Sequence, residues 1–461
     1  MQFSIIQKSE LEGARRLDAE YYQPEYLDLV DNIKRQEFDI LESFGCKVVS
    51  GPFGSTLRSD AYLERGVPFI RISDLQDFFI NNEDLVYISK EDNRRLKQSQ
   101  VNPFDLVLSK VGNTIGVVSA VPEELGVCNI SENNIGIKFK DKNVSHAYKM
   151  FLLTFLNSEL GYLQVIRNIS GNAQPKLNIS DITGLLVPIP QVKLLKVIEE
   201  LIISAKKALD SSKSFYLDAE HLLLEELGLS DFKIPEDLVW EVNYSEIKNA
   251  ERMDSDYFQP KYKVLLDKTK KHKPIKLGEL VSMKKGVEPG SSAYREEGEL
   301  FVRVSSLSKN GIQEKDQKFL SENLYQKLQK DYQPQVGEIL LTKDATPGIA
   351  YVLKQPVEGI ISGGILRLKL KKDIEPEYLA LCLNSIVGRS QAERDAGGSV
   401  IQHWKPNQIE NLLVPVLPKL KQQRISDLVK KSHEARRKSK QLLEEAKRKV
   451  EEMIEKGNKN G

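Results

Sequence analysis

The chain has 461 residues, of which 40% are hydrophobic and 29% are charged, and its formal net charge at pH 7 is +1. This length allows two or more domains with substantial cores. A net charge so close to zero excludes a surface that is basic throughout, so nucleic-acid contact would need local basic patches.

The sequence indicates a protein of the reducing cytoplasm. Cys46, Cys128 and Cys382 lie far apart and show neither zinc-ligand spacing nor a disulfide framework. The first residues, MQFSIIQKSE, lack the basic and apolar regions of a secretion signal. No stretch approaches 18 uninterrupted apolar residues, so we expect no membrane span.

The first half of the chain begins with RLDAEYYQPEY over residues 16–26. Its three tyrosines are expected to pack this segment against its own domain or a helix end, and the alternative is a role in docking a partner. The stretches FIRISDL, LVLSK and IGVVSAV over 69–121 alternate or cluster apolar and β-branched residues between turn residues, which predicts short strands. Residues 148–159 are predicted to form a helix.

A long helix is predicted over residues 191–228. Small or apolar residues recur there with a 4-3 alternation, which is the pattern of a coiled-coil seam. The seam consists of Leu194, Ile198, Leu201, Ala205, Ala208, Ser212, Phe215, Ala219 and Leu222. At 1.5 Å per residue such a helix is about 55 Å long.

The second half repeats this order of motifs. Residues 252–262 read RMDSDYFQPKY, so both copies follow the pattern R-x-D-x-x-Y-x-Q-P-x-Y. AYREEGELFVRVSSL, EILLTKDATPGIAYV and LLVPVLP then correspond to AYLERGVPFIRISDL, DLVLSKVGNTIGVV and LLVPIP of the first half. A second long helix follows, with a seam of Ile425, Leu428, Ser432, Ala435, Ser439, Leu442 and Ala446. A repeat of this length indicates that the two halves share one fold.

The predicted fold is therefore α+β. It has two tandem repeated α+β domains, joined by a long antiparallel two-helix coiled coil, with pseudo-twofold symmetry. The expected divisions are a first domain at 1–190, a first long helix at 191–232, a second domain at 233–418 and a second long helix at 419–461. Ala and Ser in the middle of both seams would let the two helices approach closely. The alternative is that each helix merely packs on its own domain.

Candidate nucleic-acid contacts lie in the predicted loops of both halves. Glycine allows a backbone to approach a phosphate, and Gln, Asn, Thr and Lys offer hydrogen bonds to phosphates or base edges. In the first half these residues are Gly51, Gly54, Ser55, Arg58, Arg71, Lys110, Asn113, Thr114, Asn172, Gln174 and Lys176. In the second half they are Lys285, Arg303, Lys343, Thr346, Ser399, Gln402, His403 and Lys405.

Some of these residues also have purely structural explanations. GPFGST over 51–56 lacks the Lys-Ser/Thr ending of a P-loop and is either a turn or a clamp for a DNA phosphate. Arg71 and Arg303 occupy equivalent positions, and each could reach DNA or pair with a neighbouring carboxylate. Trp404 could stack on a base or simply be packed.

We find no convincing catalytic site. NPFD over 102–105 lacks the second proline of the Asn-Pro-Pro-aromatic loop of amino-methyltransferases, and its copy in the second half is a plain turn. The histidines form no ligand pair at helical spacing, and the acidic residues lie mostly on helix faces. The sequence thus favours a binding and scaffolding chain, with no catalytic residue and no metal.

The order of these motifs resembles the specificity subunit of type I restriction-modification systems. The resemblance rests on GPFGST, then GVPFIRISDL, then DLVLSKVGNTIG, then LLVPIPQ leading into the heptad helix, with the same order in the second half. It covers essentially the full chain, and it lies in the order and duplication of the motifs rather than in any single one.

The resemblance implies that each domain reads one half of a split, asymmetric site in double-stranded DNA, with the coiled coil as a ruler. It also implies two modification subunits docked on this chain, which bring S-adenosylmethionine and the adenine methyltransferase site, and restriction subunits for cleavage. No cofactor is expected in this chain itself. Two alternatives remain: a coiled-coil scaffold that does not bind DNA, and a fused DNA methyltransferase.

Overall fold

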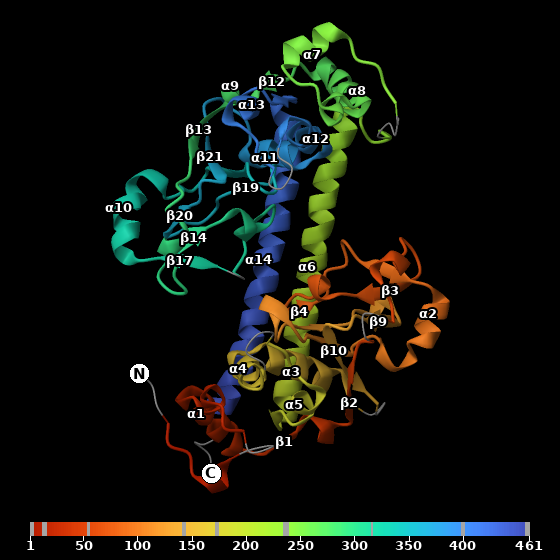
Figure 1. Cartoon of the computed structure of the whole chain (residues 1–461), viewed down its shortest axis with the longest axis vertical. Coiled ribbons are helices and arrows are strands. Elements are labelled where there is room, and N and C mark those ends of the chain that lie inside the picture. Colours follow the sequence, from red (N-terminus) through yellow and green to blue (C-terminus); the bar gives the residue numbers. More distant parts are fainter. Residues whose placement is uncertain are drawn as a thin grey trace. The chain divides into compact units, whose positions relative to one another are not determined.

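The computed structural model describes residues 4–11, 16–52, 56–140, 144–170, 175–233, 239–314, 317–397 and 402–456. By its internal contacts the chain divides into two compact units: unit 1 comprises residues 1–209 and 437–461, and unit 2 comprises residues 210–436. Each unit contains one end of both long helices, α6 (Val192–Leu227) and α14 (Lys419–Lys456). The chain is of mixed α and β class, and Figure 1 shows its elements in chain order.

Unit 1 contains a five-stranded sheet in the order β2-β10-β7-β8-β4 and a four-stranded sheet in the order β5-β3-β9-β6. A two-stranded sheet, β1-β11, lies where the chain enters α6. The strands are β1 (Phe38–Ile40), β2 (Cys46–Ser50), β3 (Val67–Ile70), β4 (Phe78–Phe79), β5 (Val86–Ile88), β6 (Gln100–Val101), β7 (Leu106–Ser109), β8 (Val118–Ala120), β9 (Cys128–Ile130), β10 (Asn134–Phe139) and β11 (Leu186–Pro188). The other helices are α1 (Pro24–Lys34), α2 (Lys90–Arg95), α3 (His146–Asn157), α4 (Glu159–Arg167) and α5 (Ile179–Thr183).

Unit 2 has a closely similar strand order. Its main sheet is β13-β21-β18-β19, its second sheet is β17-β14-β20, and β12-β22 is the short sheet before α14. The strands are β12 (Ile275–Lys276), β13 (Val281–Lys285), β14 (Glu299–Val302), β15 (Leu307–Ser308), β16 (Gly311–Ile312), β17 (Lys318–Leu320), β18 (Ile339–Thr342), β19 (Ala350–Val352), β20 (Gly359–Ile361), β21 (Ile365–Leu370) and β22 (Leu413–Val414). The other helices are α7 (Tyr244–Ala250), α8 (Pro260–Thr269), α9 (Leu277–Leu280), α10 (Glu322–Tyr332), α11 (Pro376–Asn384), α12 (Ile386–Asp395) and α13 (Pro406–Glu410).

Corresponding strands also pair in corresponding registers. In unit 1, β10 pairs antiparallel with both β2 and β7, while β3 and β9 run parallel. In unit 2, β21 pairs antiparallel with both β13 and β18, while β14 and β20 run parallel. The central strands of the main sheets consist almost entirely of buried apolar residues, because helices or the second sheet cover both faces. One departure is the β15-β16 hairpin, which belongs to unit 2.

An asparagine fixes the buried helix of each unit to a strand of its main sheet, which is next to the edge in unit 1 and at the edge in unit 2. Asn157, the last residue of α3, donates a hydrogen bond from Nδ2 to the carbonyl oxygen of Val118 on β8 (3.1 Å). Asn384, the last residue of α11, exchanges two hydrogen bonds with the backbone of Ala350 on β19, at 2.7 and 3.0 Å. A serine then caps the next helix in both cases. The helix pair is therefore held in register with the strands that carry the loops described below.

The two long helices contact each other within each unit. In unit 1, Ser439 Oγ on α14 donates to the carbonyl oxygen of Ala205 on α6 (2.8 Å), and Ile198 and Val450 share an apolar cluster. In unit 2, Ser432 Oγ donates to the carbonyl oxygen of Ser212 (2.7 Å). Such short contacts from a side chain to the backbone of the other helix require small residues at these positions.

Burial along α6 keeps a 4-3 alternation, but every second position of the buried face lies one residue later than predicted. The predicted seam residues Ile198 and Ala205 are fully buried, whereas Leu194, Leu201, Ala208 and Phe215 are half-buried. In α14, Ile425 and Ala446 are fully buried, and Leu428, Ala435 and Leu442 are half-buried. The fully buried positions in between include Ile202, Tyr216, Leu223 and Val429, each one residue later than the heptad assigns. The offset is the same in each heptad, so the buried face keeps a seven-residue repeat.

A histidine on α14, His433, should make unit 2 less stable in acid. The ring centroid of His433 lies 5.7 Å from that of Tyr351. Burial, with the positive charges of Lys354 and Arg436 nearby, lowers the pKa of His433 to about 4. In the unfolded chain this histidine has a pKa of about 6.5, so the unfolded chain binds the proton at a higher pH than the folded chain does. The free energy of unfolding should therefore fall by up to about 3 kcal/mol as the pH is lowered from about 6.5 to 4.

Chemical unfolding of the full chain at a series of pH values measures this effect. His433→Gln, which cannot be protonated, should flatten the part of the profile between pH 6.5 and 4. A variant profile that falls as steeply as that of the wild type would contradict the assignment to His433.

Candidate nucleic-acid interface

In unit 2, the turn after β18 meets the loop that precedes α13. The amide of Ala345 donates to the carbonyl oxygen of Gln402 (2.9 Å), and the amide of Trp404 donates to the carbonyl oxygen of Lys343 (2.8 Å). These backbone hydrogen bonds join segments about 60 residues apart in sequence. They bring together four of the predicted contacts, namely Lys343, Thr346, Gln402 and His403.

A carboxylate that sequence analysis did not single out organises this cluster. Asp344 accepts a hydrogen bond from Lys343 Nζ (2.5 Å), and its Oδ1 lies 2.8 Å from His403 Nδ1. Burial raises the pKa of Asp344, but the hydrogen bonds from Lys343 and His403 outweigh it and lower the pKa below the ordinary value. The carboxylate therefore stays ionised, and it orients the exposed imidazole of His403 toward the loop surface.

Unit 1 has the corresponding pair of segments. The amide of Leu177 donates to the carbonyl oxygen of Lys110 (3.2 Å), and Val111 forms an isolated β-bridge with Lys176. Lys110 Nζ donates to Ser50 Oγ (3.2 Å), and the hydroxyl groups of Thr114 and Ser109 lie 3.1 Å apart. The predicted contacts Lys110, Thr114 and Lys176 therefore lie in one cluster, with Val111 at the position that Asp344 occupies in unit 2.

A glycine turn follows the edge strand next to each cluster. In unit 1 the amide of Gly51 donates to the carbonyl oxygen of Asn134, and the amide of Lys110 donates to that of Asn133. In unit 2 the amide of Gly286 donates to the carbonyl oxygen of Ile365, and the amide of Lys343 donates to that of Gly364. Lys285, on β13 directly before Gly286, is exposed. The glycine turn and the lysine loop thus lie side by side in both units.

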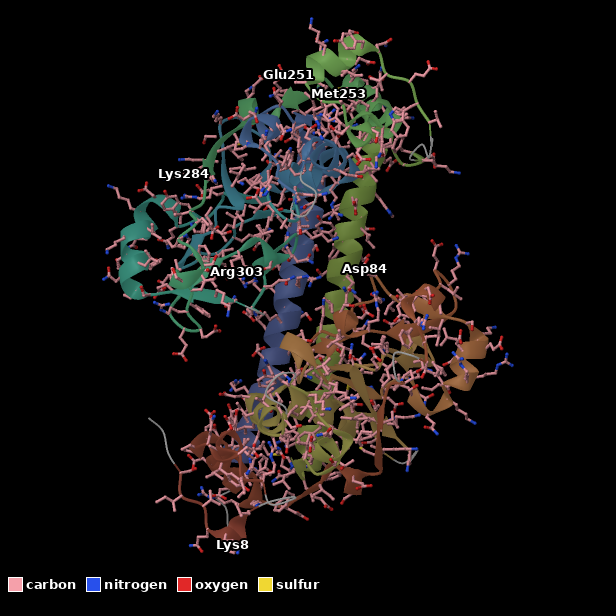
Figure 2. All side chains as sticks on the ribbon, in the orientation of Figure 1. Lys8, Asp84, Glu251, Met253, Lys284 and Arg303 are labelled. Atoms are coloured by element: carbon pink, nitrogen blue, oxygen red, sulfur yellow. The ribbon has the colours of Figure 1, made fainter. Side chains whose placement is uncertain are left out.

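The remaining predicted contacts differ in position. Lys405 is exposed at the start of α13, directly after the loop that meets Lys343, whereas Arg58 lies elsewhere and is exposed before a 3-10 turn. Arg71 forms an ion pair with Asp74 (3.1 Å), and its Nη2 donates to the carbonyl oxygen of Asp84, which is labelled in Figure 2. The carboxylate alternative for Arg71 is therefore the one observed. Arg303, also labelled in Figure 2, is half-buried and precedes the equivalent turn.

Some predicted contacts lie outside the described residues, namely Gly54, Ser55, Asn172, Gln174 and Ser399. The backbone of Asn113 belongs to a described 3-10 turn, but its side chain is outside the description. The side chain of Trp404 is fully buried, so it is packed rather than available for stacking.

The residues that sequence reasoning missed are Asp344 and Ser50. Asp344 directly follows a lysine that the repeat had already marked, and it replaces Val111 of the first half. This difference between the two copies could have marked Asp344 as a candidate from the sequence. Ser50 gave no such signal, because its contact with Lys110 depends on the pairing of β2 and β7 with β10.

The described residues offer little support for chemistry at a metal or a thiol. No group of three or more His, Cys, Asp or Glu side chains among them is arranged to hold a metal ion. Burial raises the pKa of the thiols of Cys46, Cys128 and Cys382 to about 12. Asp105, in the NPFD segment, accepts hydrogen bonds from the amides of Asn102 and Phe139, which is a structural role.

None of the helices in the described ranges combines the length and apolar composition that crossing a membrane requires.

Comparison with known proteins finds a family match over part of the chain. Residues 269–448 match the family described as the type I restriction modification DNA specificity domain. A curated relative, the type I restriction enzyme EcoBI specificity subunit of Escherichia coli, is 27% identical over 135 residues, which are 28% of this chain and 27% of the relative. The chain thus spans about a quarter of the length of that relative.

Similar solved structures include two that match over most of their length. The S subunit of a type I restriction-modification system from M. genitalium shows 13% identity and a TM-score of 0.42, over 91% of this chain and 95% of that chain. The HsdS subunit from Thermoanaerobacter tengcongensis shows 15% identity and a TM-score of 0.27, over 90% and 97% of the two chains.

Proposed function

Because residues 269–448 belong to the type I restriction modification DNA specificity domain family, we propose that this chain is the DNA-recognition subunit of a type I restriction-modification complex. In this role it selects the DNA sequence and positions partner subunits, and it catalyses no reaction itself. The family match lies mostly in unit 2, and the proposal extends the same role to unit 1.

The observation that carries the proposal is the repeated pairing of a lysine loop with a second polar loop. In unit 1 the pair is 110–114 with 175–177, and in unit 2 it is 343–349 with 402–405. Each pair offers an exposed lysine, Lys176 or Lys405, and hydrogen-bonding side chains beside a glycine turn, which suits contact with phosphates and base edges in the major groove. The differences between the pairs, such as Val111 against Asp344, suit two different half-sites.

We further propose that the two units are tandem target-recognition domains held by an antiparallel coiled coil. The shared strand order and the serine-to-backbone contacts between α6 and α14 within each unit support this. The target would then be bipartite and asymmetric, with an unread spacer set by the helices and about 34 Å between the half-site centres. The net charge of +1 suits weak, salt-sensitive binding by this chain alone.

The partners in this proposal are double-stranded DNA, two modification subunits and the restriction subunits, in the cytoplasm. S-adenosylmethionine would bind to the modification subunits, which hold the adenine methyltransferase site. This division of labour separates the proposal from a fused methyltransferase, which would bind the methyl donor itself. It also separates it from a scaffold, which would not bind DNA.

Methylome sequencing of the host with and without this chain tests the proposal. We expect adenine methylation at one split, asymmetric sequence to disappear when the chain is deleted and to return when it is supplied again. An unchanged methylome, with the modification subunit still expressed, would contradict the proposal. Binding of S-adenosylmethionine by the purified chain would favour the fused enzyme.

A further inference from the structure

The two copies of the opening phrase build the same rigid loop. In unit 1, Arg16 forms an ion pair with Asp18 (2.6 Å), and its guanidinium lies 4.3 Å from the ring centroid of Tyr21. The same guanidinium donates to the carbonyl oxygens of Asn168 and Ile169, just beyond the end of α4. A cation at this place complements the unsatisfied carbonyl groups of a helix end.

Unit 2 repeats this construction with its own residues. Arg252 forms an ion pair with Asp254 (2.8 Å), lies 4.6 Å from the ring centroid of Tyr257, and donates to the carbonyl oxygens of Arg394 and Asp395 at the end of α12. A second arginine from the helix approaches each tyrosine: Arg167 in unit 1 at 3.9 Å and Arg394 in unit 2 at 5.3 Å. The loop is therefore fixed on both of its sides in each unit.

The residue between the arginine and the aspartate points outward in both loops. Leu17 is 81% exposed and Met253, labelled in Figure 2, is 86% exposed. A single exposed apolar residue needs no explanation, but here two bulky ones occupy the same position on two pinned loops. Two carboxylates follow each of them within three residues, Asp18 and Glu20 in unit 1 and Asp254 and Asp256 in unit 2.

We infer that these two loops are equivalent docking points for two copies of one partner protein. The partner's surface would carry an apolar pocket that accepts Leu17 or Met253, with Lys or Arg side chains on its rim to face the carboxylates. One surface that occurs twice on a duplicated chain fits a partner that binds twice. This rests on the proposed function, in which that partner is the modification subunit.

Leu17→Glu and Met253→Glu test the inference in the full-length chain. Each variant is mixed with the modification subunit of the same host, and native mass spectrometry and titration give stoichiometry and affinity. We expect two modification subunits on the wild type, one on each single variant and none on the double variant. The dissociation constant at the altered loop should rise at least about 30-fold, because an apolar contact is lost and a charge is added.

The controls separate docking from folding. Val127→Glu and Val336→Glu alter half-exposed valines elsewhere on units 1 and 2, and they should leave the stoichiometry at two. Exchanging the two apolar side chains, Leu17→Met with Met253→Leu, should also retain two. The thermal unfolding midpoint of every variant should match the wild type, since the altered side chains are exposed.

DNA binding by the same preparations separates this inference from the proposed function. A double variant that still binds two modification subunits with wild-type affinity overturns the inference. The inference is also overturned if the wild-type chain binds its DNA target but binds no modification subunit, although the recognition function then stands. If the wild type shifts no DNA, with or without the modification subunit, the proposed function fails as well.

Discussion

A chain in which residues 206–212 and 433–439 are both duplicated is expected to prefer a DNA target whose spacer is about three base pairs longer. These segments lie between two crossings of α6 and α14, Ala205 with Ser439 and Ser212 with Ser432. Each duplication adds one heptad, which keeps the seam on the same face. It lengthens each helix by about 10 Å, at 1.5 Å per residue, and base pairs stack about 3.4 Å apart.

Selection of bound duplexes from a library with variable spacers measures this preference. Binding to the original spacer should fall at least about 100-fold, because one half-site can no longer be contacted and each good base contact contributes about 1–3 kcal/mol. Duplication in α6 alone is the matched control. It places the two seams out of register and should weaken binding at every spacer length. If the double duplication keeps the original spacer, the helices do not act as a ruler.

Replacing Gly51 or Gly286 with alanine is expected to destabilise the main sheet of the unit concerned. A Cβ atom on Gly51 would lie 1.9 Å from the carbonyl oxygen of Ser131, and one on Gly286 would lie 2.2 Å from that of Ser362. Both neighbours are backbone atoms next to a sheet strand, so neither can rotate away. We expect a loss of at least about 3 kcal/mol in each variant.

Two other glycines supply the controls for this prediction. A Cβ on Gly184 of unit 1 would meet only the carbonyl oxygen of Ser180, at 3.6 Å, and a Cβ on Gly397 of unit 2 would meet nothing within 4 Å. Their alanine variants should unfold within about 0.5 kcal/mol of the wild type in urea. If Gly51→Ala and Gly286→Ala behave like these controls, the close approach at the glycine turns is not required.

The duplication made much of this architecture readable from the sequence. The strands around 69–121, the buried helix ending at Asn157 and the α6 segment all follow from periodicity that occurs twice. The same packing was predicted for both copies of the aromatic trio: Tyr21, Tyr22 and Tyr26 are all buried, whereas in the second copy Tyr262 is buried and Tyr257 and Phe258 are half-buried. Local patterns suffice for these features because each depends on neighbouring residues.

Contacts between residues far apart in the chain could not be predicted from the sequence. Lys343 was predicted to be a nucleic-acid contact in a loop, but its side chain is buried and pairs with Asp344. The meeting of loops 343–349 and 402–405 depends on how α11 and α12 pack on the sheet, which no local pattern records. Likewise, the heptad assigned Phe215 to the seam, whereas Tyr216 is the buried residue, because it packs in the apolar core of unit 2 with Ala350.

The most direct test of the central claim compares the base preferences of two loop variants. Thr114→Ala with Lys176→Ala alters the loop pair of unit 1, and Gln402→Ala with His403→Ala alters that of unit 2. Each variant, in complex with the modification subunit, is used to select duplexes from a randomised library. We predict that each loses base preference in one half of the split target only, and that the two halves differ. Loss in the same half, or an equal weakening across all sequences, would contradict the account.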